Sequence, residues 1–218
     1  TYTSEQAEAL IKLAKQADLI LQVGHIERFN SAFIHVNHPK EALQHIQATR
    51  SCPFKERGTH VSVILDMMIH DIDLVLYLQR HASLEKITCT GKRVRSQHID
   101  IAQAHLHFSD GCVAELTADR VNPAMTRTLT LTQSKLRQYV DFQEKTIRTI
   151  TLPEEGEHTL FQAPQTDALH AEISDFLHCI LRKKQPVVDG TAGLIALRLA
   201  LNIEETINKQ LNATSNQH

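Results

Sequence analysis

Apolar residues at helical spacing open the chain. Thr3-Ser4-Glu5-Gln6 has the form of a capping box, and residues 7–17 continue with apolar positions three and four apart. Residues 19–24 then form an apolar run with little alternation, which is typical of a parallel strand buried on both faces. A helix followed by such a strand is the closing unit of a doubly wound sheet. The rest of that sheet and its Gly-x-Gly-x-x-Gly turn are absent from the sequence, so we expect a truncated chain.

Beyond Gly24 the pattern changes to alternating apolar and polar positions, as in strands. Thr128, Thr130 and Thr132 alternate with leucines, which predicts a strand with one wet face. Ser109-Asp110-Gly111 favours a hairpin turn, and the short links between runs favour an antiparallel sheet. The predicted strands are residues 42–52, 87–95, 101–108, 112–118, 128–132, 137–142 and 146–152.

Three further segments carry the periodicity of helices. Residues 64–78 are apolar on nearly every side, a second apolar stripe ends before Pro186, and Asp189-Gly190-Thr191 begins the last helix. Residues 212–218 are polar and predict a flexible tail. The predicted fold class is therefore α+β. An open antiparallel-rich sheet domain with flanking helices occupies residues 26–211, and the closing αβ unit of a doubly wound domain precedes it at residues 1–25.

Polar side chains within the apolar helix 64–78 are the first candidates for chemistry. Asp66, His70 and Asp73 recur at four and three residues, which places them on one face of a helix. Burying ionisable groups costs free energy unless they are paired or perform chemistry. Asp66 and His70 therefore look like a proton-transfer pair, and the alternative is a satisfied structural hydrogen bond. Asp73 is expected to cap or pair within the helix rather than to contact a ligand.

Composition sets broad limits on function. The chain has 218 residues, 42% of them hydrophobic and 22% charged, which fits a globular protein with a sizeable core. A net charge of −2 without a basic block argues against nucleic-acid binding. Four scattered cysteines suit reduced thiols in the cytoplasm, and no run is long enough for a membrane span. We expect a cytoplasmic protein with no nucleic-acid or membrane partner.

Fourteen histidines raise a second hypothesis. His105 and His107 lie on one face of a predicted strand, as in metal-binding β-barrels, and with Asp66 and His70 they predict a metal-dependent hydrolase or isomerase. The alternative is an ordinary sheet surface, since no third ligand at tight spacing is evident and no metal ligand is assigned. A third hypothesis is a non-catalytic module that pairs subunits.

Three segments together resemble the glucose–fructose oxidoreductase, inositol 2-dehydrogenase and MocA family of nicotinamide-dependent sugar dehydrogenases. Residues 22–30 are similar to the family's crossover from its last Rossmann strand into the substrate domain. Asp66-x-x-x-His70-Asp71 is similar to its catalytic helix, and residues 186–190 are similar to its C-terminal end. Their order and spacing cover essentially the whole chain.

The resemblance implies roles for individual residues. His70 would accept a hydroxyl proton while hydride passes to NAD or NADP, and Asp66 would bind a neighbouring hydroxyl or hold the His70 tautomer. His25, Arg28, Asn30 and Arg50 would bind substrate. Gly24, His25 and Arg28 would contact the cofactor. For Arg28 a surface ion pair is the alternative.

The resemblance also interprets the start of the chain. Residues 1–25 would be the end of the Rossmann domain, and the glycine-rich loop, the acidic ribose-binding residue and the Glu-Lys-Pro motif with the catalytic lysine are absent. Such a fragment is expected to be inactive alone.

Within the family, residues 23–30 and Arg50-Ser51-Cys52-Pro53-Phe54 look like UDP-N-acetylglucosamine 3-dehydrogenases, which serve lipopolysaccharide precursor synthesis. The expected substrate is a small sugar or sugar nucleotide. The strands outnumber the helices that can cover them, so we expect a homo-oligomer through the open sheet face.

Overall fold

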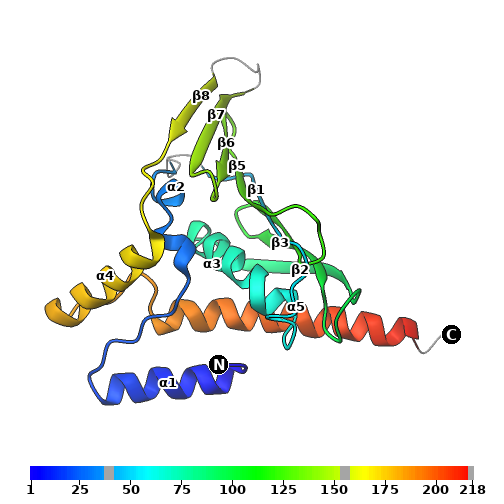
Figure 1. The fold of residues 1–218 in the computed structure, drawn as a ribbon, viewed down its shortest axis with the longest axis horizontal. Coiled ribbons are helices and arrows are strands. Elements are labelled where there is room, and N and C mark those ends of the chain that lie inside the picture. The colour runs from blue at the N-terminus through cyan, green and yellow to red at the C-terminus, as the bar shows by residue number, and fades with distance from the viewer. Residues whose placement is uncertain (37–41, 153–157, 216–218) are drawn as a thin grey trace.

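A single open sheet of eight strands organises the computed structural model, which describes residues 1–36, 42–152 and 158–215 (Figure 1). The strand order is β2-β3-β4-β1-β5-β6-β7-β8. The bounds are β1 His45–Ser51, β2 Leu84–Lys92, β3 Ile101–Phe108, β4 Val113–Asp119, β5 Thr126–Thr132, β6 Leu136–Asp141, β7 Thr146–Thr151 and β8 His158–Gln162. The predicted α+β class with an open, antiparallel-rich sheet is confirmed.

Strand pairing is antiparallel except at one position. β1 lies between β4 and β5, parallel to the first and antiparallel to the second. The predicted turn joins β3 to β4, where Gly111 has a φ of 85° that glycine adopts without strain. The sequence therefore locates the hairpin between β3 and β4. The parallel pairing of β1 with β4 joins strands far apart in the chain, so no local signal predicts it.

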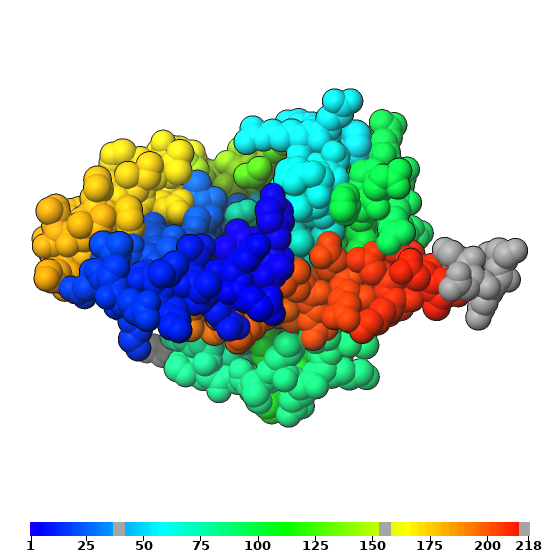
Figure 2. Space-filling model, turned by 90° about the horizontal axis from the view of Figure 1, so that it is seen from below, coloured from blue at the N-terminus to red at the C-terminus, as the bar shows by residue number. Residues whose placement is uncertain are grey.

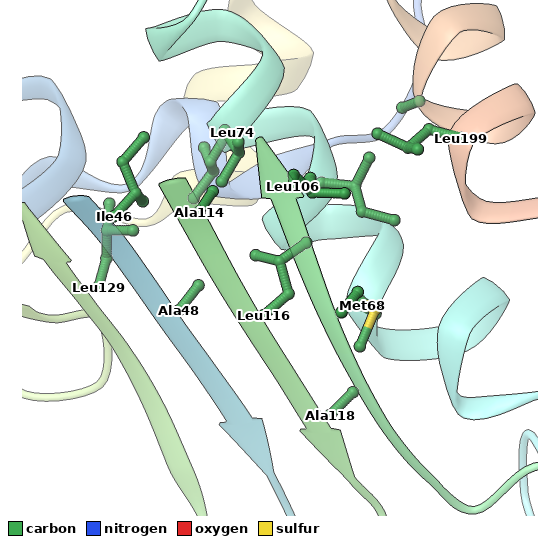
Figure 3. Packing of buried hydrophobic residues seen from close by; sticks show 14 of the residues in the cluster. Ile46, Ala48, Met68, Leu74, Leu106, Ala114, Leu116, Ala118, Leu129 and Leu199 are labelled. Atoms are coloured by element: carbon green, nitrogen blue, oxygen red, sulfur yellow. The ribbon is translucent and has the colours of Figure 1, made fainter. Parts of the chain in front are cut away.

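The main core lies between one sheet face and the helices. Ile46 and Ala48 of β1 and Leu129 of β5 point to this face, as their alternation predicts. Leu74 and Leu199 of the helices belong to the same core cluster, and Figure 3 shows Leu74 close to Ala114 and Leu199 on the side of Leu106. Thr128, Thr130 and Thr132 of β5 point to the other face of the sheet, which no described helix covers in Figure 1.

The helices contact different elements of the fold. The long α5 packs along β2 and the central helix α3, while α4 contacts the short turn η1 and α2 contacts β6. Among the described helices, none combines the length and apolarity that crossing a bilayer requires. The bounds are α1 Ser4–Gln16, η1 (a 3₁₀ helix) Ile26–Phe29, α2 Ser31–Ile34, η2 Ile64–Met68, α3 Ile69–Leu78, α4 Ala168–Arg182 and α5 Gly190–Ser215.

The predicted helix 64–78 consists of two parts. Its first turn, η2, is a π-helix and only the remainder, α3, is α-helical. π-turns are wider than α-turns and occur frequently at functional sites. Side chains four residues apart across this junction therefore do not align as they would on a regular α-helix.

The N-terminal unit follows the prediction only in part. The capping box is present, with Thr3 accepting the N–H of Gln6, and α1 packs against α5 (Figure 2). The predicted strand 19–24 is not formed, and the segment makes an isolated bridge between Gln22 and Asp189. A strand requires a hydrogen-bonding neighbour, and the described chain offers this segment no other extended backbone.

Several boundaries differ from the sequence prediction: β1 begins at His45 and not at residue 42, and β2 begins at Leu84 and not at residue 87. β2 ends at Lys92, because Asp100 binds the N–H groups of Val94, Arg95 and Ser96 and bends the chain. At the C-terminus α5 continues to Ser215, into the segment predicted as a tail, of which residues 216–218 lie outside the described part. β8 was not predicted, because all five of its residues are exposed and carry no alternation of burial.

Candidate active site

A cleft of about 560 Å³ opens beside η2, and residues from several distant segments line it. Loop 52–61, between β1 and η2, forms one wall, and the ends of β1, β4 and β5 form the other. Its lining includes both members of the proposed catalytic pair. The lining residues are Ile26, Glu27, Arg50, Ser51, Cys52, Lys55, Arg57, Gly58, His60, Asp66, Met67, His70, Arg120 and Arg127.

His70 presents an imidazole whose Nδ1 is buried without a hydrogen-bond partner. Burial, together with the nearby positive charge of Arg50, lowers the pKa of His70 to about 3. The ring is therefore neutral at physiological pH, and a neutral imidazole nitrogen accepts a proton. This is the protonation state in which a general base acts, although a pKa closer to neutrality makes proton transfer more efficient.

His25 lies next to His70. The two rings meet edge to face with centroids 5.7 Å apart, and His25 is 4% exposed. Neither nitrogen of His25 has a hydrogen-bond partner, and burial lowers the pKa of this imidazole as well. His25 also lines a smaller apolar cavity, between α1 and α5, so the histidine pair separates two hollows.

Asp66 faces the cleft from the π-turn. A Cβ built on Gly58 would lie 2.8 Å from Asp66 Oδ2, so loop 52–61 approaches the carboxylate closely only because residue 58 is glycine. Loss of solvent raises the pKa of Asp66, although Arg120 opposes this effect. Within the described residues no hydrogen bond joins Asp66 to His70, and both line the cleft separately.

Asp73 lies away from Asp66 and His70 and forms a buried pair with Arg28. Arg28 Nε and Nη2 donate to Asp73 Oδ2 and Oδ1 at 2.6 and 2.9 Å, and the guanidinium lies 4.0 Å from the centre of the Tyr77 ring. The sequence predicts that Asp73 caps or pairs within its own helix, but its partner Arg28 lies on η1, 45 positions earlier in the chain. The Arg28 side chain is thus directed into the domain and is absent from the described cleft lining.

Arg50 joins the helix to the sheet below the cleft. It donates to both oxygens of Asp71 at 3.0 and 2.8 Å and to Glu27 Oε1 at 2.9 Å. Burial alone would lower the pKa of Arg50, but these two carboxylates raise it above its ordinary value. Arg50 lines the cleft, yet its charge is already matched by two acids.

Asn30 and Gly24 lie on the connection that enters the sheet domain. The Asn30 amide donates to Glu27 and to the Phe142 carbonyl, at 3.2 and 3.1 Å, and its side-chain oxygen caps α2. Gly24 lies beside the Glu172 carboxyl group of α4. Gly24 directly precedes His25, and Asn30 follows Glu27 by three residues, but neither Gly24 nor Asn30 lines the described cleft.

Arg120 and Asp100 were not among the residues expected at the site. Arg120 Nε donates to Asp100 at 2.8 Å, and its Nη1 donates to the carbonyls of Gly58 and Val61 at 3.1 and 2.8 Å. Asp100 also accepts the Ser96 hydroxyl. A signal was available, because Arg120 continues the inward alternation of β4, where a charge requires a partner.

The histidines of the hydrolase hypothesis lie elsewhere. His105 and His107 occupy the uncovered face of β3, where His105 Nδ1 lies 3.7 Å from Glu115. The described residues contain no group of three or more His, Cys, Asp or Glu side chains suited to a metal ion. All four cysteines are free thiols.

Comparisons with known proteins agree with this geometry. Residues 15–136 match the GFO/IDH/MocA C-terminal domain. The UDP-N-acetylglucosamine 3-dehydrogenase of Acidithiobacillus ferrooxidans is 31% identical over 218 residues, covering 95% of this chain and 68% of the relative. Its solved structure has a TM-score of 0.87 at 32% identity, over 95% of this chain and 67% of that one.

More distant structures share the fold. An aldose-aldose oxidoreductase from Caulobacter crescentus, complexed with glycerol, has a TM-score of 0.81 at 17% identity, over 96% of this chain and 68% of that one. An oxidoreductase from Agrobacterium radiobacter in complex with NAD⁺, L-tartaric acid and magnesium has a TM-score of 0.80 at 12% identity, over 94% and 68%. The chain thus spans about two thirds of each relative.

The open sheet, the cleft with its neutral imidazole and the matched relatives define an NAD(P)-dependent oxidoreductase. The chain belongs to the GFO/IDH/MocA family. The resemblance drawn from the sequence is confirmed, and the matched relatives lend no support to the hydrolase or pairing-module alternatives.

Proposed function

We propose that the protein oxidises a ring hydroxyl of a sugar nucleotide, with UDP-N-acetylglucosamine as substrate and the hydroxyl on carbon 3 as the reacting group. The observation that carries the proposal is the neutral imidazole of His70, with its Nδ1 buried and unpartnered, at the wall of a cleft large enough for a sugar. The similarity to a UDP-N-acetylglucosamine 3-dehydrogenase over 95% of the chain supports the choice of substrate.

In this proposal His70 accepts the hydroxyl proton as the carbon–oxygen bond becomes a carbonyl. Asp66, on the same wall, binds a neighbouring sugar hydroxyl, because its carboxylate has no side-chain hydrogen bond of its own in the described structure. The buried groups Arg28, Asn30 and Arg50 act as positioning residues. Their hydrogen bonds connect η1 to α3 and β1 and so keep His25 and His70 at a constant separation.

The residues around His25 fit a nicotinamide cofactor, whose ring would have to contact the sugar in the cleft for hydride to pass. Both nitrogens of His25 are buried without partners, and buried polar atoms of this kind gain free energy from a ligand that bonds to them. Gly24 and His25 would hold the cofactor there, with Arg28 supporting them through Asp73. When bound, the nicotinamide ring would accept the hydride from the sugar carbon, as NAD or NADP does in related dehydrogenases.

We further propose that the protein acts in the cytoplasm on a lipopolysaccharide precursor. We also propose that residues 1–25 close a Rossmann domain, that residues 26–211 form the substrate domain and that residues 212–218 end as a tail. A second copy would cover the open sheet face, because the described helices pack on the opposite one.

The test uses the full-length gene product with UDP-N-acetylglucosamine and, in turn, NAD⁺ and NADP⁺. Reduced cofactor should accumulate together with a 3-keto sugar nucleotide identified by mass spectrometry. His70→Asn should lower kcat about 100-fold or more, the scale of a lost general base. His81→Asn, at an exposed turn, is the matched control and should keep normal turnover.

Absence of any reduced cofactor with this substrate would contradict the proposed function. Near-normal turnover of His70→Asn at neutral pH would contradict the assignment of the base.

A further inference from the structure

The positive charges on the cleft rim have no established partner. The two arginines that the sequence suggested for binding an anion, Arg28 and Arg50, are both matched by buried carboxylates. Three other cations also adjoin the cleft, and all three are exposed: Lys55, Arg57 and Arg127. The described structure gives these three side chains neither a hydrogen bond nor an ion pair, although all three line the cleft.

Arg127 holds a defined position beside the catalytic pair. It lies at the start of β5, directly opposite Arg50 of β1 in the antiparallel register, so the two side chains share a sheet face. Its charge is one of those that lower the pKa of His70. An anion bound to Arg127 would therefore lie next to the group that receives the proton.

Lys55 and Arg57 lie on loop 52–61, whose backbone is anchored by hydrogen bonds. Arg120 binds the carbonyls of Gly58 and Val61, and Asp100 fixes Arg120 in turn. Gly58 has a φ of 87°, which favours glycine, and the loop closes tightly over Asp66 there. A loop held in this way loses little conformational entropy when a ligand binds.

The charge balance of the described lining favours an anion. Glu27 is matched by Arg50, and Arg120 is matched by Asp100. Among the described lining side chains this leaves three cations facing the carboxylate of Asp66. Exposed Glu56 lies between Lys55 and Arg57 in sequence, and it does not line the cleft. The rim therefore has an excess of positive charge beside a polar, sugar-sized hollow.

We propose that Lys55, Arg57 and Arg127 bind the diphosphate of the sugar nucleotide, while the sugar ring reaches inward to Asp66 and His70. This rests on the proposed function for the sugar, and it adds the group that holds the nucleotide. Arginine suits the role because its planar guanidinium donates two parallel hydrogen bonds to phosphate oxygens. Arg120 is a positioning residue for this subsite.

Binding of UDP, UMP and uridine, measured by calorimetry on the full-length protein, tests the inference. Affinity should fall from UDP to UMP to uridine and should weaken as salt concentration rises. The double variant Arg57→Gln/Arg127→Gln should lose about tenfold or more in UDP affinity, as expected when two charged hydrogen-bond donors are removed from a partly exposed site. Arg182→Gln, an exposed arginine of α4 outside the cleft, should bind UDP as the wild type does.

Steady-state kinetics and NADH binding provide separate readouts. If the inference holds, the double variant raises KM for the sugar nucleotide with little change in kcat, since the diphosphate is held equally in ground and transition states. Its affinity for NADH should be unchanged. Equal UDP affinity in wild type and double variant would overturn the inference, and so would a loss confined to NADH, which would assign the rim to the cofactor's diphosphate.

The two proposals fail in different ways. Tight UDP binding that depends on Arg57 and Arg127, without oxidation of UDP-N-acetylglucosamine, would leave the subsite in place and remove the proposed substrate. Oxidation of that substrate with kinetics unaffected by the double variant would retain the proposed function and remove the subsite.

Discussion

At the scale of single residues, burial determines the chemistry of the candidate site. His70 and His25 are ordinary imidazoles in the sequence, but the fold buries His25 fully and His70 in part, and it provides no hydrogen-bond partner for His70 Nδ1 or for either nitrogen of His25. The protonated form is disfavoured, so both rings are neutral near pH 7. A neutral imidazole is the form that can accept a substrate proton.

This burial predicts a pH dependence of stability. The pKa of His70 falls from about 6.5 in the unfolded chain to about 3 in the folded one, so between these values the unfolded state binds more protons. The contribution of His70 is therefore complete above pH 6.5 and is lost as the pH falls toward 3. In this window it changes the free energy of unfolding by about 1.4 kcal/mol per pH unit.

Urea unfolding of wild type and His70→Asn at a series of pH values measures this contribution. The wild type should lose stability more steeply than the variant as the pH is lowered from 6.5 to 4.5. Asp100, whose pKa is held low by backbone N–H groups, acts below this range and is present in both proteins. Parallel curves for the two proteins would show that the His70 environment is wetter than the structure indicates.

At the scale of elements, loop 52–61 and the turn after β2 are joined by one buried ion pair. Arg120, which follows β4, donates to two backbone carbonyls of loop 52–61. Asp100 accepts three backbone N–H groups of the turn after β2. The two elements cannot be arranged independently. The wall of the cleft that carries Arg57 and Gly58 is thus positioned by residues that do not themselves react.

Removing one member of this pair should be costly. Arg120→Met would leave Asp100 buried without its guanidinium partner, and we expect a loss of about 3 kcal/mol in the free energy of unfolding. KM for the sugar nucleotide should also rise, because loop 52–61 loses its anchor. Arg80→Met, which removes an exposed arginine bonded to the Tyr77 carbonyl, is the control and should stay within about 0.5 kcal/mol of wild type. Equal stability of the two variants would contradict the anchoring role.

At the scale of the whole molecule, the described helices leave one face of the sheet uncovered. Thr49 of β1 lies opposite Thr117 of β4 and Thr128 of β5, so a row of threonines crosses the middle of that face. All three are half-buried by their neighbours. The threonine row itself carries no charge, so covering it with a second copy would leave none of its side chains as an unpaired buried charge.

The proposed self-association predicts the effect of a bulky charge at the centre of this face. The full-length protein should be a dimer or larger by light scattering at micromolar concentration. Thr49→Arg should shift it toward monomer, because paired copies would bring like charges together. His81→Arg, at an exposed turn, should not change the assembly. A wild-type protein that is strictly monomeric would rule out pairing through the sheet.

The sequence by itself determined the elements with strong local signals. The alternation in 128–132 and 101–108, the hairpin at Gly111 and the capping box at Thr3 all depend on neighbours within a few residues, so periodicity sufficed to locate them. The same holds for the existence of the helix that carries Asp66 and His70. Both side chains line one cleft, and their action as a proton-transfer pair stays a prediction.

Only the tertiary structure decided which partner each charge takes and which segments pair. Arg28 bonds to Asp73, 45 positions away, and Arg50 bonds to Asp71, 21 positions away, so neither pairing has a local signature. The π-turn at Asp66, the parallel contact of β1 with β4 and the missing strand at 19–24 likewise depend on distant neighbours. Hydrogen bonds and ion pairs formed across the fold carry no periodicity in the chain, and for that physical reason they had to be seen in three dimensions.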